Sequence, residues 1–153
     1  MQKPVIYIAA LMVVFIACGK DKFNTKPTLT IKSISSSTVP QSGQLQILFE
    51  FTDKEGDVSD SIFMKKIRIN TIPAQLDPID SFGFKVPDFP KKSKGDIQLN
   101  LDYNLHLTGS TLPPTQGNPP QNVADTMIYR FALRDQAGNI SDTVQTDPIV
   151  IIR

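Results

Sequence analysis

The feature that most restricts the fold of this chain is the alternation of apolar and polar residues. A period of two places successive side chains on opposite faces of a β-strand, so that one face is buried and the other meets solvent. The alternation is clearest over residues 96–108, strong over 44–51 and 127–133, and weaker over 28–34, 63–69 and 149–152. No segment has the 3.6-residue period of a helix, and the sequence therefore predicts an all-β protein.

Proline-rich segments separate the predicted strands. Residues 73–95 contain four prolines and a basic cluster, and residues 112–122 contain four more prolines. Proline cannot donate a hydrogen bond to a neighbouring strand, so these segments are expected to be loops or sheet edges. Several short strands with turns between them predict an antiparallel β-sandwich over residues 28–153.

The N-terminus has the pattern of an export signal. Lys3 precedes an unbroken run of 12 apolar or aromatic residues, from Val5 to Ile16. This run fits the roughly 7 to 15 residues of a signal-peptide core and is shorter than the roughly 20 residues of a membrane-spanning helix. We therefore expect residues 1–17 to be a signal peptide and residues 18–27, which are mostly polar, to be a flexible tether.

The end of the apolar run resembles the lipobox of bacterial lipoproteins, through the residues Phe15-Ile16-Ala17-Cys18. The resemblance implies cleavage before Cys18, attachment of lipid such as palmitate to Cys18, and anchoring in the bacterial outer membrane. The following Lys20-Asp21 resembles the surface-export signal of Bacteroidetes lipoproteins, and the domain is expected to face either the periplasm or the cell surface. The alternative is that Cys18 is an ordinary small residue near a secretory cleavage site.

Cleavage at Cys18 would leave 136 residues, the size of one domain, with 15 basic and 15 acidic residues. A neutral chain lacks the electrostatic footprint for nucleic acid or anionic lipid surfaces, so no nucleic-acid partner is expected. With its one cysteine carrying lipid, the domain has no disulfide framework and depends on core packing.

Two predicted strands end in acidic glycine turns, at residues 49–57 and 129–141. The second segment, Tyr-Arg-Phe-Ala-Leu-Arg-Asp-Gln-Ala-Gly-Asn-Ile-Ser, resembles the F strand and following turn of bacterial immunoglobulin-like and fibronectin type III-like domains. The first, Phe-Glu-Phe-Thr-Asp-Lys-Glu-Gly-Asp, resembles their B strand and turn. The resemblance implies an immunoglobulin-like β-sandwich of about seven strands, a fold that serves many unrelated functions.

In such a sandwich these two turns lie at the same end, which would bring seven polar residues together. They are Asp53, Glu55, Asp57, Asp60, Asp135, Asn139 and Asp142. Oxygen ligands in this number suit Ca²⁺. The alternative is that Asp, Asn and Gly stabilise tight turns without any ion. The spacing does not fit an EF-hand loop.

No catalytic residue is predicted. His106, the single histidine, lies in the polar phase of its segment and is expected to be a solvated surface residue. No nucleophile, zinc or phosphate-binding motif is present. A hydrolase that uses two carboxylates is the remaining enzymatic alternative.

Two further kinds of site are suggested. Phe82, Phe84 and Phe89 are candidates for an exposed aromatic patch that holds a ligand such as a glycan, and the alternative is that they cover an open face of the sheet. Ser61, Thr126 and Thr143 each follow Asp and precede an aliphatic residue. This arrangement resembles the sites at which Bacteroidetes O-glycosylate exported proteins.

The sequence thus favours a lipid-anchored cell-envelope lipoprotein whose β-sandwich is a non-catalytic binding or structural module. Its expected partners are the membrane, through the lipid, and an envelope protein or glycan. The alternative function is a glycan-binding accessory lipoprotein of a surface polysaccharide-uptake system.

Overall fold

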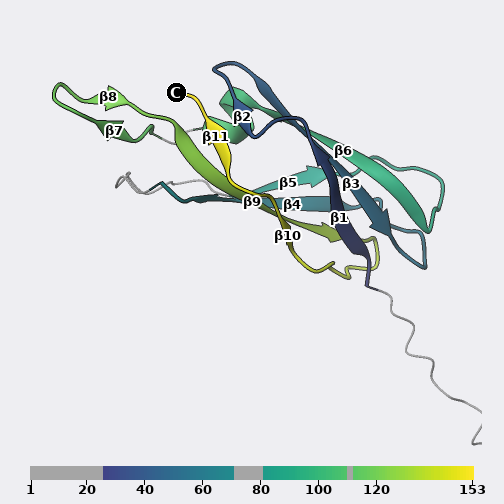
Figure 1. Ribbon diagram of the computed structural model, residues 1–153. Coiled ribbons are helices and arrows are strands. Elements are labelled where there is room, and N and C mark those ends of the chain that lie inside the picture. The colour runs from purple at the N-terminus through teal and green to yellow at the C-terminus, as the bar shows by residue number, and fades with distance from the viewer. Residues whose placement is uncertain (1–25, 71–80, 110–111) are drawn as a thin grey trace, which may run out of the picture.

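The computed structural model describes residues 26–70, 81–109 and 112–153 (Figure 1). The predicted signal peptide, Cys18 and most of the tether lie outside these residues. Within them, two β-sheets face each other, and the predicted all-β antiparallel sandwich is confirmed.

The first sheet has three antiparallel strands in the order β1-β3-β6: β1 (Thr28–Ile34), β3 (Gln44–Thr52) and β6 (Lys94–Asp102). The second has the order β2-β11-β9-β4-β5, with β10 beside β9: β2 (Thr38–Val39), β11 (Ile149–Ile151), β9 (Asp125–Arg134), β4 (Ser61–Arg68), β5 (Ser81–Lys85) and β10 (Val144–Gln145). A hairpin of β7 (Thr115–Gln116) and β8 (Gln121–Asn122) projects at one end of the sandwich (Figure 1).

The N-terminal strand is shared between the two sheets. β1 pairs with β3 in the first sheet, and β2 pairs with β11 in the second. The β2–β11 pair is parallel and is the exception to the antiparallel arrangement among the described strands. If β1 with β2 and β10 with β11 are each counted as one divided strand, the sandwich has the expected seven strands, apart from the hairpin.

The core lies between the sheets and consists of the residues that the alternation placed on one face. Phe49 of β3 and Phe131 of β9 meet across the sheets, edge to face, with ring centroids 4.9 Å apart. The largest fully buried side chains include Leu45, Ile47, Phe51, Ile62, Met64, Leu101, Met127, Tyr129 and Leu133.

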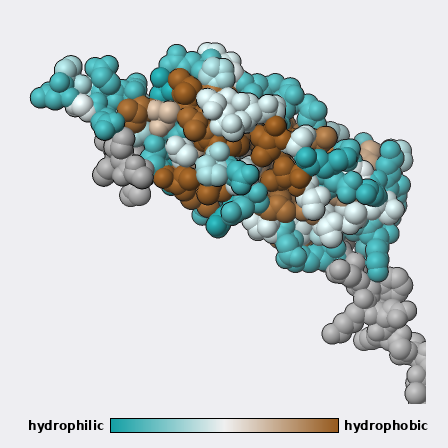
Figure 2. Space-filling model, in the orientation of Figure 1, coloured by the Kyte–Doolittle hydropathy of each residue, from teal (hydrophilic) through white to brown (hydrophobic). Residues whose placement is uncertain are grey.

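In the space-filling view, apolar surface remains along the middle of the visible face, whereas the β7–β8 end is hydrophilic (Figure 2).

The prediction of a continuous strand over residues 96–108 is wrong beyond Asp102. Residues Tyr103–Thr108 form one π-helical turn, which is the single helix among the described residues. Asp102 Oδ1 accepts a hydrogen bond from the Leu105 N–H at 2.9 Å, and His106 Nδ1 accepts one from the Asp102 N–H at 2.9 Å. These side-chain contacts compete with strand pairing. The alternation fails as a result, and Leu105 is 63% exposed.

The proline-rich segment 73–95 was expected to be a loop or a sheet edge, and β5 within it is an edge strand of the second sheet. β5 lies within it and pairs with β4 along the edge of the second sheet, where Met64 lies opposite Phe82. In the parts of the chain that the structure describes, no helix is long and apolar enough to cross a membrane.

Candidate functional site

The two acidic turns meet at one end of the sandwich, as the sequence predicts. Asp53 follows β3 and Asp135 follows β9, and these strands end on the same side of the molecule. The Gln136 N–H donates to the Asp57 carbonyl oxygen at 2.9 Å and joins the turns directly. The side chains of Asp53, Asp57 and Asp135 each bring one carboxylate oxygen within 4.8 Å of the other two. We call this group the acidic cluster.

Gly56 allows the first turn to fold back on itself. Its φ of +69° lies in the left-handed region, and a Cβ at this position would lie 2.9 Å from the Lys92 backbone nitrogen. A side chain would therefore be both conformationally strained and sterically blocked. The tight turn lets the Asp57 N–H donate to Asp53 Oδ2 at 2.9 Å, which holds the two carboxylates together.

The carboxylate oxygens of the acidic cluster differ in their partners. Both oxygens of Asp135 accept from Asn139, from its N–H at 2.7 Å and from Nδ2 at 2.9 Å. By contrast, Oδ1 of Asp53 and Oδ1 of Asp57 are buried and accept no hydrogen bond. Asp53 as a whole is only 3% exposed. The cluster thus contains two buried acceptor oxygens that the polypeptide leaves unsatisfied.

The electrostatics of the cluster agree with this geometry. Burial raises the pKa of Asp57 above its usual value, and it is raised further by the hydrogen bond that a protonated Asp57 could donate to Asp53 and by the negative charges of Asp135 and Asp53. A hydrogen bond from the backbone of Asp57 to its own carboxyl group lowers the pKa, but it does not cancel these effects. The direction of this pKa shift is the one expected for carboxyl groups held close together in a partly buried site.

The other four residues predicted for this site lie outside the three-carboxylate group. Asn139 serves as a donor to Asp135, and Glu55 is exposed. Asp60 forms an ion pair with Arg134, and the hydrogen bond from that guanidinium lowers the pKa of Asp60. Asp142 is exposed and binds Lys26 Nζ at 2.5 Å. The predicted convergence of carboxylates is thus limited to Asp53, Asp57 and Asp135.

The three predicted aromatic residues form two groups that pack against the core. Phe82 and Phe84 of β5 are half-buried and both contact the ring of His106, at 5.7 and 5.2 Å between centroids. Phe89 instead packs on Phe51 at 5.9 Å. This arrangement agrees with the alternative that the rings cover an open face of the sheet.

His106 was expected to be a solvated surface residue, and the structure shows it only partly exposed. It is half-buried beside the two phenylalanines, and burial lowers its pKa.

The candidate O-glycosylation residues differ in accessibility. Ser61 is half-buried and lies 3.4 Å from Asp60 Oδ1. Thr126 is half-buried and follows Asp125, which is fully buried. Thr143 is exposed. Of the three, Thr143 presents the most accessible hydroxyl.

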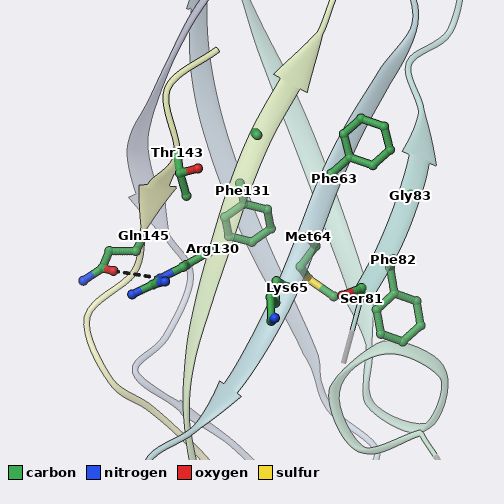
Figure 3. Close-up of a pocket in the computed structure, with 11 residues that line it drawn as sticks. Phe63, Met64, Lys65, Ser81, Phe82, Gly83, Arg130, Phe131, Thr143 and Gln145 are labelled. Atoms are coloured by element: carbon green, nitrogen blue, oxygen red, sulfur yellow. Dashed lines mark hydrogen bonds between the residues drawn. The ribbon is translucent and has the colours of Figure 1, made fainter. Parts of the chain in front are cut away.

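A groove that the sequence did not suggest lies on the outer face of the second sheet (Figure 3). It has a volume of about 830 Å³ and spans β5, β4, β9 and β10. Phe63 stands on this face between Gly83 and Ala132, which are its cross-strand neighbours on either side. Because Gly83 has no side chain, the Phe63 ring lies over it, with Cε1 3.7 Å from the position that a Cβ would take, and Phe63 remains 36% exposed.

Polar side chains line the groove opposite Phe63. Arg130 Nε donates to Gln145 Oε1 at 3.2 Å, and the pair lies across the groove from the Phe63 ring (Figure 3). Thr143 adds a hydroxyl group nearby. The Arg134 guanidinium lies 5.1 Å from the Phe63 ring centroid, in a cation–π contact. The site thus combines an exposed ring with planar hydrogen-bonding groups.

One sequence signal could have indicated this groove. Phe63 is an aromatic residue in the outward phase of β4, between the buried Ile62 and Met64. The small neighbours Gly83 and Ala132 are distant in sequence, however, and only the strand register shows that they flank it.

Comparison with known proteins gave no match, either to a protein-family model or to a curated protein. The fold and the two sites define the protein as an all-β sandwich with a buried acidic cluster at one end and an open groove on one face.

Proposed function

We propose that the chain is an envelope lipoprotein, anchored through Cys18, whose β-sandwich is a non-catalytic binding module. The observation that supports binding is the groove of about 830 Å³, with the exposed Phe63 on one side and the Arg130–Gln145 pair on the other. Ligand sites characteristically combine apolar surface with a few placed polar groups. The anchor itself is supported by the lipobox-like residues 15–18.

The position of the N-terminus suggests how an anchored domain would stand on the membrane. β1 begins at the end that carries the acidic cluster, since Thr28 lies opposite Thr52. Residues 18–27 can span at most about 36 Å when fully extended. Anchoring at Cys18 would therefore hold the acidic end near the membrane and direct the β7–β8 hairpin away from it.

We expect radiolabelled palmitate to be incorporated by the wild-type chain and not by Cys18→Ser. The change removes the thiol that would carry the lipid and leaves the folded residues untouched. Label on the protein after purification from a lipoprotein-processing bacterium is the measurement. Equal labelling of both chains, or labelling of neither, would remove the anchor from the proposal.

A glycan is the second candidate for the ligand class, and a specific feature of the groove favours it. Aromatic rings pack against the apolar faces of sugars, while planar polar side chains bind their hydroxyl groups. Phe63, Arg130 and Gln145 supply this combination around one hollow. The protein would then act as an accessory glycan-binding lipoprotein of a polysaccharide-uptake system.

We expect Phe63→Ala and Arg130→Ala each to weaken retention on the envelope polysaccharide by about tenfold, the effect of losing about 1.4 kcal/mol of binding. A glycan array followed by affinity electrophoresis measures this. Leu105→Ala is the matched control, because Leu105 is exposed and apolar but does not line the groove. Equal loss in Leu105→Ala would contradict a groove-specific site. If the chain captures an envelope protein but no glycan, and if Phe63→Ala prevents that capture, the result would favour a protein ligand over a glycan.

A further inference from the structure

We propose that Asp53, Asp57 and Asp135 bind one Ca²⁺ ion between the two acidic turns. Their contributing carboxylate oxygens lie within 4.8 Å of one another. Oxygens that share one Ca²⁺ at about 2.4 Å can be at most about 4.8 Å apart, so the observed spacing is compatible with a common ion. The groups come from two turns that follow strands of opposite sheets.

The unsatisfied oxygens of Asp53 and Asp57 indicate that a ligand belongs here. Asp53 is 3% exposed, and its Oδ1 is buried with no hydrogen-bond donor. Oδ1 of Asp57, the next carboxylate of the same turn, is in the same state. Burying a carboxylate oxygen without a partner is costly, and proteins satisfy such groups by pairing or by metal coordination. A cation bound by the acidic cluster in contact with these oxygens would remove that cost.

Turn stabilisation alone does not account for the arrangement. It explains Asp53 Oδ2, which accepts the Asp57 N–H, and it explains Asp135, which accepts both donors of Asn139. It leaves the Oδ1 atoms of Asp53 and Asp57 without a function in the turn. A tight turn also does not require carboxylates from two separate loops to be buried side by side.

The donor set selects the kind of cation. All three groups are carboxylates, and hard oxygen ligands favour Ca²⁺ or Mg²⁺ over transition metals. Ca²⁺ accepts six to eight oxygens in flexible geometry, whereas Mg²⁺ demands a near-ideal octahedron and retains its own water molecules. Because Asp57 is partly exposed, water can complete the Ca²⁺ shell from the solvent side. A bound ion would join the turn after β3 to the turn after β9, and would therefore stabilise the contact between the sheets.

The test uses the full-length chain, purified in mild detergent and stripped with EGTA. Adding CaCl₂ to about 100 times the dissociation constant should raise the melting temperature by about 10 °C. Isothermal titration calorimetry with CaCl₂ should show saturable binding of one ion. Asp57→Asn should abolish both the shift and the heat, because it removes one anionic ligand. Glu55→Gln, an exposed acidic residue in the same turn, should retain them.

The melting temperature of Asp57→Asn in EGTA separates lost binding from lost folding. We expect it to equal or exceed that of the wild type, since the change removes like-charge repulsion without adding bulk. A wild-type chain with neither a shift nor heat in CaCl₂ overturns the proposal. An equal loss in Glu55→Gln also overturns it, and an equal shift with MgCl₂ overturns the assignment of Ca²⁺.

Discussion

Replacing Asp125 with alanine is expected to lower the free energy of unfolding by about 3–5 kcal/mol. Asp125 begins β9 and is completely buried. Its Oδ1 lies 2.8 Å from Nη2 of Arg68, and its Oδ2 lies 2.5 Å from Nη2 of Arg153. The two arginine side chains are themselves only 10% and 8% exposed. Loss of the carboxylate would remove the negative charge that two buried guanidinium groups share.

Urea denaturation of the wild type and Asp125→Ala measures this effect. Asp147→Ala is the control, because Asp147 is exposed and its replacement should change the free energy of unfolding by less than about 0.5 kcal/mol. A loss of under about 1 kcal/mol in Asp125→Ala would mean that water or other groups stabilise the charges of the two arginines. The charge cluster would then not be needed to hold the start of β9 in place.

The strands were predictable from the sequence wherever burial of one face dominates their energetics. β1 has the predicted bounds, and β3 and β9 contain the predicted alternation. The prediction fails after Asp102 because local hydrogen bonds from Asp102 and His106 outweigh the apolar pattern. The prolines around β5 indicated a loop or a sheet edge, and β5 is an edge strand, but they did not indicate that Ser81–Lys85, which contains no proline, would form it.

The sites were less predictable than the strands, because they depend on which residues the sheets bring together. The resemblance of the two turns indicated that Asp53, Asp57 and Asp135 would meet, but not that Asp60 would turn toward Arg134. The groove requires the register that places Gly83 and Ala132 beside Phe63. The Arg68–Asp125–Arg153 cluster likewise unites three positions that share no motif.

Phe131→Ala is expected to lower the free energy of unfolding by about 3–5 kcal/mol, similar to the loss for other large core aromatics. Phe131 is 1% exposed, and its ring meets the ring of Phe49 edge to face, at 4.9 Å, between the two sheets. The substitution would remove the apolar contact and leave a cavity that strands paired on both sides of β9 cannot readily close. Phe131→Leu, which keeps most of the volume, should cost about 1–1.5 kcal/mol.

Phe63→Ala is the matched control for this prediction, because Phe63 is an aromatic residue on the neighbouring strand but points to the outer face. We expect its replacement to cost less than about 1 kcal/mol, mainly through loss of the cation–π contact with Arg134. Urea denaturation of both variants is therefore a direct comparison of the two faces of one sheet. Equal losses would contradict the assignment of Phe131 to the core and of Phe63 to the groove. A much smaller loss in Phe63→Ala would show that this variant keeps the fold. Weaker ligand binding by Phe63→Ala could then be attributed to the groove and not to unfolding.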